Sequence, residues 1–203
     1  MPNSRLVAKS NKAMRLVLAS KSPRRRQLLS EMGFPVEVVS LDVDEHLDTP
    51  INPRHAAEIL ACRKAEAFPE QQLEQNDVLV TADTVVIADN DILGKPANHE
   101  EASAMLHRLS GREHHVCTGV CLRSREKQFS FTEETSVHFL PLSDQVIEYY
   151  IDHYRPYDKA GAYGIQEWIG MVGISHIEGC FYNVMGLPVA RLYRELTNRF
   201  LSK

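Results

Sequence analysis

The sequence predicts an α/β fold in which a mixed, twisted β-sheet is flanked by helices and two lobes enclose a central cleft. Short apolar segments typical of strands alternate along the chain with segments of helical periodicity. One long pair of strand-like segments is joined by a short charged turn, which indicates an antiparallel hairpin. Ligands of such sheets bind at strand ends and between lobes, so we expect the functional site in the cleft.

Length and charge narrow the class of protein. The 203 residues can bury one large core, and we expect residues 14–203 to form a single domain of two lobes, preceded by a loose, polar tail over residues 1–13. The formal net charge of -4 argues against a general nucleic-acid binder and against a membrane-surface protein. No apolar run approaches the roughly 20 residues of a membrane span, and no secretory signal is evident. We therefore expect a cytoplasmic protein with a small-molecule partner.

The first predicted elements are a strand over residues 16–19 and a helix over residues 23–32. Ser22 is a preferred N-cap residue, and Pro23 suits the first helical position because its φ is fixed and it has no N–H to leave unpaired. Gly33 is placed to end the helix. The sequence thus indicates a sharp strand-to-helix corner.

Two arginines, Arg24 and Arg25, stand in the first turn of this helix. Free N–H groups and the positive end of the helix dipole lie there, and guanidinium groups offer bidentate donors, so the corner is suited to phosphate oxygens. The alternative is that both arginines are solvated surface residues.

The next predicted elements are a strand over residues 35–40, an acidic loop over residues 42–45 and a helix over residues 53–68. Lys64 borders the apolar stripe of that helix. A lysine in such a position often only extends its charge to solvent, which is the alternative to a role in binding.

A carboxylate interrupts the next strand, predicted over residues 78–87. The segment is nearly continuous in apolar residues, as in a strand buried on both faces, except around Asp83. A polar turn at residues 89–91 returns the chain as a hairpin, which we expect to bring Lys95 alongside Asp83. A structural ion pair between these two residues is the alternative to a catalytic role for the aspartate.

The remaining segments continue the alternation of helices and strands. Residues 159–166 are rich in glycine and fit neither period, which favours a binding loop. We expect Val146, Ile147, Tyr150 and Tyr154 to face inward from their helix. The predicted elements are a helix at 99–109, hairpin arms at 115–123 and 129–139, and helices at 144–154 and 189–200.

The four cysteines show neither a CxxC pair nor zinc-ligand spacing with the nine histidines. We therefore expect buried, reduced thiols. They are Cys62, Cys117, Cys121 and Cys180.

Six short motifs follow one another in order between about residues 15 and 196. They are SKSPRR at 20–25, DE at 44–45, ADTVV at 82–86, GKP at 94–96, SG at 110–111 with His115 and Thr118, and AGAYGIQ at 160–166. Together they resemble the Maf family of nucleotide pyrophosphatases. The resemblance implies hydrolysis of a nucleoside triphosphate to the monophosphate and pyrophosphate with a divalent metal ion, in the cytoplasm, on a fold similar to that of the inosine triphosphate pyrophosphatases.

Cleavage between the α and β phosphates requires charge neutralisation and a positioned water. Asp83 is the candidate for holding that water or a metal, and the resemblance implies that it is the proton acceptor. Glu45 is the second candidate ligand for Mg²⁺ or Mn²⁺, because such hard cations take few protein carboxylates beside waters and phosphate oxygens; the alternative is a solvated loop carboxylate. The candidate substrate-binding residues are Ser20, Arg24, Arg25, Lys64 and Lys95.

Three positions sort the subfamilies within the resemblance, and here they carry Arg24, Thr84 and Gln166. This set is similar to the dTTP and UTP branch, whereas the sister branch usually has tryptophan, glutamine and glutamate. A glutamine amide can accept from the N3–H of uracil or thymine and donate to a ring carbonyl. The chain departs from the family at Glu167 and Trp168, where a glycine is usual; Trp168 could stack on a base or pack within a lobe.

The expected function is therefore hydrolysis of dTTP, UTP and modified pyrimidine triphosphates in the upkeep of nucleotide pools. The alternatives are a purine or 7-methyl-GTP substrate and a nucleotide-binding regulator of septum formation. We expect a homodimer and no membrane or nucleic-acid partner.

Overall fold

The computed structural model describes residues 14–46 and 51–201, so the predicted tail at residues 1–13 lies outside the described residues. These ranges contain a seven-stranded sheet in the order β2-β1-β3-β5-β6-β7, with β4 paired to β3. Strand β1 is parallel to β2 and β3, and the other pairings are antiparallel. The predicted mixed α/β sheet is confirmed. The strands are β1 (Arg15–Ala19), β2 (Val36–Val39), β3 (Asp77–Ala88), β4 (Asp91–Leu93), β5 (Glu113–Arg123), β6 (Gln128–Phe139) and β7 (Ile174–Glu178).

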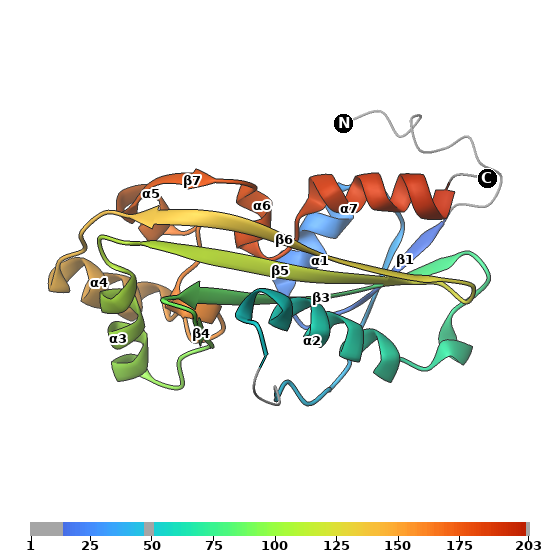
Figure 1. Cartoon of the computed structure of the whole chain (residues 1–203), viewed down its shortest axis with the longest axis horizontal. Helices are drawn as coiled ribbons and strands as arrows, with labels where there is room; N and C mark the ends of the chain where they lie inside the picture. Colours follow the sequence, from blue (N-terminus) through green and yellow to red (C-terminus); the bar gives the residue numbers. More distant parts are fainter. Residues whose placement is uncertain (1–13, 47–50, 202–203) are drawn as a thin grey trace.

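Helices cover both faces of this sheet and one of its ends (Figure 1). In one lobe, α1 and α7 lie on one face and α2 lies on the other, and in the second lobe α3, α4 and α5 surround the far ends of the long strands. The helices are α1 (Pro23–Glu31), α2 (Pro53–Ala67), α3 (His99–Leu109), α4 (Asp144–Tyr154), α5 (Trp168–Gly173), α6 (Phe181–Met185) and α7 (Val189–Leu196), with short turns η1 (Glu70–Gln72), η2 (Ala160–Ala162) and η3 (Thr197–Leu201).

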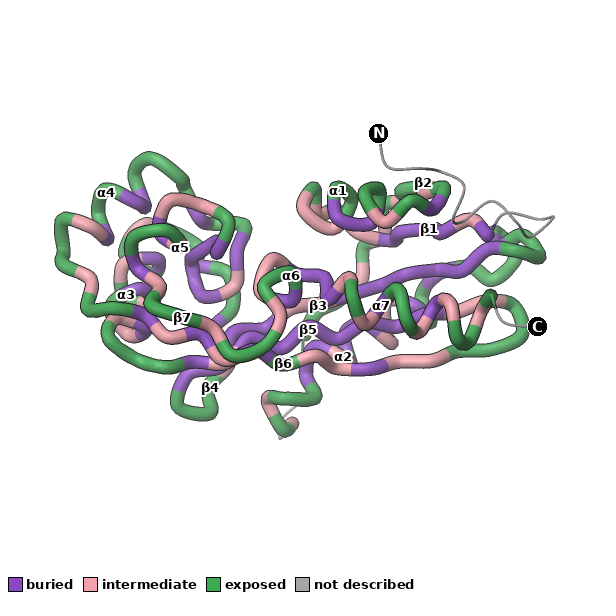
Figure 2. The backbone as a smooth tube through the Cα atoms, turned by 90° about the horizontal axis from the view of Figure 1, so that it is seen from above, coloured by how far each residue is buried: buried purple, intermediate pink, exposed green. Residues whose placement is uncertain are grey.

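The long strands β3, β5 and β6 run through both lobes (Figure 2). Strands β3 and β5 are buried along most of their length, whereas β6 has buried residues only at intervals. The alternation of side chains assigns Val80 and Ala82 of β3 to the core beneath α1 and α7, and Leu79 to the core beneath α2. Further along the same strand, Val86 and Ala88 belong to the core of the second lobe. The two lobes therefore share one continuous sheet.

A glycine sets the distance between α2 and the sheet. A Cβ added to Gly119 in β5 would lie 2.2 Å from the carbonyl carbon of Ala57, so a side chain larger than hydrogen would push α2 outward. Gly119 stands opposite Asp83 on β3. The close approach therefore brings α2 down onto the part of the sheet that carries this carboxylate.

The predicted corner after β1 is confirmed in detail. Ser22 caps α1 by accepting a hydrogen bond from the backbone N–H of Arg25, Pro23 occupies the start of the helix, and Gly33 has a φ of 84° just past its end. Helix α3 has the predicted bounds.

Three short elements were not predicted, namely β7, α5 and α6. They are too short to show a clear period, and β7 is an edge strand without a fully buried residue. The predicted inward face of α4 is partly wrong: Ile147 and Tyr150 are buried and Val146 is half-buried, but Tyr154, in the last turn, is 37 % exposed. Ile151, which was not predicted to face inward, is buried. The last predicted helix ends at Leu196 and continues as a π-helical turn.

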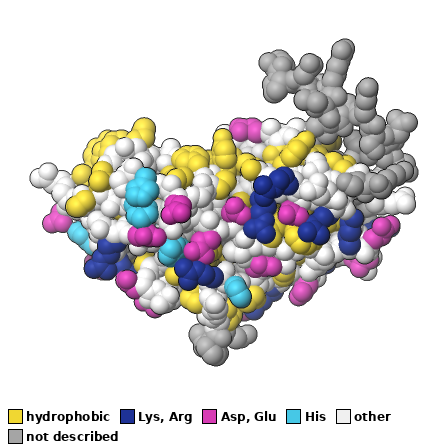
Figure 3. Space-filling model, turned by 45° about the horizontal axis from the view of Figure 1, so that its top comes forward, with side chains coloured by type: hydrophobic (Ala, Val, Ile, Leu, Met, Phe, Trp, Pro, Cys, Tyr) yellow, Lys and Arg dark blue, Asp and Glu magenta, His cyan; other side chains and the backbone are white. Residues whose placement is uncertain are grey.

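The four cysteines are free, as expected. Cys117 and Cys121 are buried, whereas Cys62 and Cys180 are half-buried. Among the residues described, no helix is both long and apolar enough to cross a membrane. On the face shown in Figure 3, Lys and Arg side chains are interspersed with Asp and Glu side chains and do not form a continuous basic surface.

Candidate active site

The candidate site lies where β3 has an open edge. Strand β1 pairs with β3 only as far as Val80, and β4 pairs with the same edge again from Val86. A cavity of about 910 Å³ adjoins the intervening residues 81–85. It is lined by all the sequence-predicted site residues, which are Ser20, Arg24, Arg25, Glu45, Lys64, Asp83, Thr84, Lys95 and Gln166.

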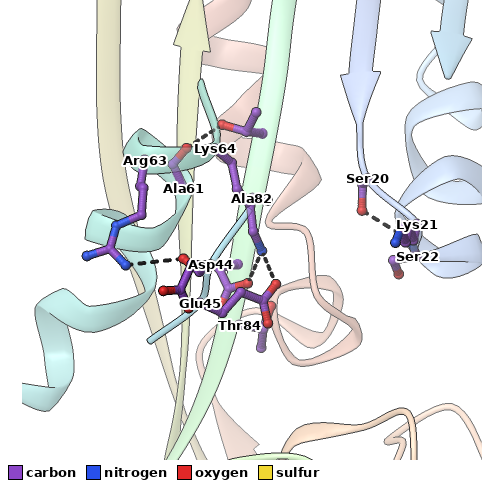
Figure 4. A network of polar contacts seen from close by, with 12 residues as sticks. Ser20, Lys21, Ser22, Asp44, Glu45, Ala61, Arg63, Lys64, Ala82 and Thr84 are labelled. Carbon is purple, nitrogen blue, oxygen red and sulfur yellow. Dashed lines mark hydrogen bonds and ion pairs between the residues drawn. The ribbon is translucent and has the colours of Figure 1, made fainter. Parts of the chain in front are cut away.

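An ammonium group joins two carboxylates at the centre of this cavity. Lys64 reaches from α2, and its Nζ lies 2.5 Å from Oδ1 of Asp83 and 2.7 Å from Oε1 of Glu45. Figure 4 shows Lys64 directed toward the loop that carries Glu45. The side chains of Lys64 and Asp83 are each only 14 % exposed. The ammonium is thus held between carboxylates and does not simply extend to solvent.

The structure corrects the expected partner of Asp83. The hairpin was expected to place Lys95 beside this carboxylate, but the cation in contact is Lys64. The reason is the close packing of α2 on β5, which the local sequence around the hairpin does not reveal. Lys95 is exposed and lines the same cavity.

The ionisation of Glu45 reports the positive potential of the site. Partial burial raises the pKa of Glu45, but the hydrogen bond from Lys64 and the charges of Lys64, Lys95 and Arg25 outweigh it and bring the pKa below its usual value. Glu45 is therefore an ionised member of the site and not merely a solvated loop residue.

Arg25 fills the open edge of β3. Its Nη1 donates to the carbonyl of Ala82 at 2.8 Å, its Nε donates to the carbonyl of Gly186 at 2.9 Å, and its Nη2 donates to Oγ1 of Thr84 at 3.0 Å. Burial lowers the pKa of Arg25, while the negative charges of Asp83 and Glu45 act in the opposite direction. Arg25 therefore ties α1 to β3 and to the segment after α6, while adding positive charge to the cavity.

The hydroxyl of Thr84 has a defined direction. Thr118 Oγ1 donates to the carbonyl of Asn183 at 3.0 Å and lies 2.9 Å from Thr84 Oγ1, so Thr118 accepts there and Thr84 is the donor. Thr84 also accepts from Arg25. The Thr84 hydroxyl proton is therefore already donated to Thr118, and only one lone pair of its oxygen remains to accept a hydrogen bond from a ligand.

The side chain of Arg24 extends away from the strand-to-helix corner at residues 19–25 and connects the two lobes. Its Nη1 lies 2.9 Å from Oδ2 of Asp158, which follows α4 in the second lobe. Asp158 also contacts Nζ of Lys159 at 2.6 Å, and both of these cations help lower the pKa of Asp158. Ser20 remains in the corner, where its Oγ accepts from the backbone N–H of Ser22 at 3.2 Å.

The irregular segment at residues 158–166, which includes the predicted binding loop at 159–166, forms another side of the cavity. Gln166 is exposed there. Trp168 lies behind this loop, where its ring packs on Tyr149 with centroids 4.7 Å apart, so lobe packing and not base stacking accounts for it. Glu167 does not line the cavity either, and its carboxylate contacts Tyr150 and Lys159.

Sequence reasoning did not single out Asp158, and it did not predict the contacts that Lys159, Tyr150 and Glu167 make with one another. Asp158 and Lys159 directly precede the AGAYGIQ motif at 160–166, but their contacts depend on how the loop folds onto α1 and α4. The described residues contain no cluster of three or more His, Cys, Asp or Glu suited to a metal. Asp42, Asp44 and Asp158 also line the cavity, but Glu45 and Asp83 are the two carboxylates that meet at Lys64.

A family model described as Maf-like protein matches residues 15–199. The chain belongs to the Maf family. This Maf protein is 50% identical over 187 residues to a protein of Parabacteroides distasonis named dTTP/UTP pyrophosphatase, with 91% of this chain and 96% of that protein covered. A protein of the same name from Porphyromonas gingivalis is 50% identical over 187 residues, covering 91% and 94%.

A further relative, from Flavobacterium psychrophilum and also named dTTP/UTP pyrophosphatase, is 42% identical over 184 residues, covering 91% of this Maf protein and 94% of its own chain. Among solved structures, the Staphylococcus aureus Ham1 protein is similar with a TM-score of 0.43 and 14% identity, over 62% of this chain and 71% of that one.

Proposed function

We propose that this Maf protein hydrolyses dTTP and UTP to the monophosphate and pyrophosphate. The observation that carries the proposal is the placement of Asp83 on the open edge of β3, in contact with Lys64 and inside a cavity that Arg25 and Lys95 also line. Relatives that cover most of the chain are named dTTP/UTP pyrophosphatase, which supports the pyrimidine substrates.

In the proposed reaction, a water oxygen attacks the α phosphorus, the bond from that phosphorus to the bridging oxygen breaks, and pyrophosphate leaves. Asp83 accepts the proton of the water. Lys64 donates to Oδ1 of Asp83 and so leaves the second carboxylate oxygen for the water. The cations around the cavity stabilise the charge that develops on the phosphoryl oxygens and on the leaving pyrophosphate.

A divalent cation, Mg²⁺ or Mn²⁺, is the proposed cofactor. Two carboxylates at one position fit such a cation, which completes its shell with waters and phosphate oxygens. Glu45 and Asp83 would hold it beside the ammonium of Lys64. When bound, the cation would polarise the phosphoryl oxygens.

Base selection is assigned to Gln166, with Thr84 and Arg24 as the other specificity positions. The exposed Gln166 amide can satisfy both the N3–H and a carbonyl of uracil or thymine. Thr84 can contribute only an acceptor, because its proton is used by Thr118.

The test is pyrophosphate release from a panel of dTTP, UTP, CTP, GTP and 7-methyl-GTP, with Mg²⁺, Mn²⁺ or EDTA. We expect the highest kcat/KM for dTTP and UTP and loss of turnover in EDTA. A preference for 7-methyl-GTP or a purine would replace the pyrimidine assignment. Nucleotide binding without any hydrolysis would instead favour the regulatory role.

Two further properties belong to the proposal. A cytoplasmic location agrees with four free cysteines, because reduced thiols are usual in that compartment. A homodimer is checked by size-exclusion chromatography with light scattering, where a mass of twice 23.0 kDa is expected.

A further inference from the structure

The loop that carries Gln166 is held by a buried cluster of side chains, formed by Tyr150, Lys159 and Glu167, of which only Lys159 lines the cavity. Glu167 Oε1 lies 3.0 Å from Nζ of Lys159, and Oε2 accepts a hydrogen bond from the hydroxyl of Tyr150. The Tyr150 hydroxyl in turn accepts from the backbone N–H of Gly164 at 3.0 Å. The carboxylate of Glu167 thus holds Tyr150 of α4 and Lys159 at the start of the loop. Through Tyr150 it also holds Gly164 in the middle of the loop.

The members of this cluster are shielded from water. Tyr150 is fully buried, and the side chains of Lys159 and Glu167 are 8 % and 19 % exposed. Burial, together with the hydrogen bond and charge of Glu167, raises the pKa of Tyr150, so the phenol keeps its proton and remains a donor to the carboxylate. Removing Glu167 would leave two buried polar groups with fewer partners, which is costly in such surroundings.

Gln166 lies directly against this cluster. A Cβ added at Gly164 would stand 2.9 Å from Nε2 of Gln166, 3.0 Å from Cδ of Glu167 and 3.1 Å from Cε of Lys159, so the three side chains converge on this glycine. The backbone N–H of Glu167 donates to the carbonyl of Gly164 at 3.0 Å and closes the turn that contains Gln166. A shift of Glu167 would therefore move the Gln166 amide.

The cluster is also connected to the phosphate corner. Lys159 contacts Asp158, and Asp158 contacts Arg24 on α1. This chain of contacts ends at Glu167, through Lys159. Arg24, Asp158 and Lys159 line the cavity, whereas Glu167 does not. Glu167 therefore acts through other residues and has no direct contact with a ligand in the cavity.

We propose that Glu167 is a specificity-determining positioning residue, which with Tyr150 and Lys159 fixes the Gln166 amide for recognition of a base that presents an N3–H and ring carbonyls. The proposal rests on the proposed function, since it assumes that Gln166 reads the base. It assigns selectivity between uracil and cytosine to a carboxylate outside the cavity.

The experiment compares Glu167→Ala, Glu167→Gln and Tyr150→Phe with the wild type, using UTP and CTP. We expect Glu167→Ala to reduce the ratio of kcat/KM for UTP over CTP about tenfold, mainly through KM for UTP, with kcat changed less than about threefold. Glu167→Gln should fall between Ala and wild type, because its amide oxygen can still accept from Tyr150 but lacks the charge that pairs with Lys159.

Matched controls are Glu148→Ala and Tyr149→Phe on α4. Both residues are exposed neighbours that lie outside the cluster, and we expect both variants to keep the wild-type ratio. If Glu167→Ala fails to fold, Tyr150→Phe decides the question, because it keeps the buried ring and removes only the hydroxyl.

Binding of α,β-imido analogues of UTP and CTP, measured by calorimetry, separates this inference from the proposed function. Wild-type selectivity for the uridine analogue without any hydrolysis of UTP would refute the proposed function alone. An unchanged ratio of dissociation constants in Glu167→Ala and Tyr150→Phe would overturn the inference alone. Loss of that ratio in both variants, with the controls unchanged, is the expected result.

Discussion

The two walls of the cavity hold their side chains by different means. The first wall, made by α1, α2 and the open edge of β3, carries its charges on regular elements: Lys64 is on a helix, Asp83 is on a strand, and Arg25 is bonded to backbone carbonyls. The second wall, residues 158–166, has little regular structure and depends on the side chains of Tyr150 and Glu167 behind it.

The difference matches the tasks proposed for the two walls. Proton transfer and charge stabilisation need groups whose positions hardly change, and backbone hydrogen bonds in a helix and a sheet provide that rigidity. Selection of a base can be altered by changing a loop without disturbing the sheet. We therefore expect that each wall can be perturbed without the other.

The largest effect is expected in the first wall, from Asp83→Asn. The amide keeps the shape of the side chain but cannot accept the proton, so kcat should fall by about 10²–10⁴-fold while the protein remains folded. Pyrophosphate release and a thermal melt measure the two quantities. Asp152→Asn, at an exposed position of α4, is the control, and wild-type turnover in Asp83→Asn would remove this residue from the reaction.

Arg25→Lys tests the structural side of the same wall. A lysine cannot reproduce the three guanidinium hydrogen bonds, so we expect the free energy of unfolding to fall by about 2–3 kcal/mol. Urea unfolding measures this change. Arg26→Lys, on the exposed side of α1, should change stability by less than about 0.5 kcal/mol; equal stability of the two variants would contradict the bridging role of Arg25.

In the second lobe, His114 is expected to make stability depend on pH. Its ring packs against Phe139 and Tyr163, and burial, followed by the charges of His115 and His138, lowers the pKa of His114 to about 3. The unfolded chain takes up this proton below about pH 6.5 and the folded protein does not, so His114 stabilises the fold above that pH and loses this contribution as the pH falls toward 3.

The wild type should therefore lose about 1.4 kcal/mol more than His114→Gln between about pH 6 and pH 5, as measured by urea unfolding. His107→Gln, exposed on α3, should keep the wild-type dependence. A wild-type curve parallel to that of His114→Gln would show that the buried ring carries no such linkage.

The smallest effect is expected from Arg24→Ala, which removes the contact between the walls. We expect kcat/KM for UTP to fall about fivefold, mainly through KM, because one half-buried cation near the phosphates and the contact with Asp158 are lost. Arg26→Ala is the matched control. A fall in kcat as large as that of Asp83→Asn would mean that the two walls act as one unit.

The sequence is informative about the first wall because its signals are local. Ser22 and Pro23 define the start of α1, and Asp83 is conspicuous in an otherwise apolar strand. The contact between Lys64 and Asp83 could not be predicted in this way, since it depends on the packing of α2 against Gly119, far along the chain.

The contacts that hold the second wall could not be predicted from the sequence for a related reason. An irregular loop has no period, and the partners of Glu167 come from α4 and from the start of the loop. The same holds for the buried face of α4, where Ile151 replaces the predicted Tyr154 because the neighbouring helices decide which turn is covered.

The interruption in pairing along β3 has a consequence for solubility. An exposed strand edge usually attracts another polypeptide, and long flat edges are templates for aggregation. Here β1 and β4 pair with β3 at either end and leave only residues 81–85 unpaired on this edge, and the carbonyl of Ala82 already accepts a hydrogen bond from Arg25. The protein can thus keep part of a central strand accessible to a small molecule while denying it to a second chain.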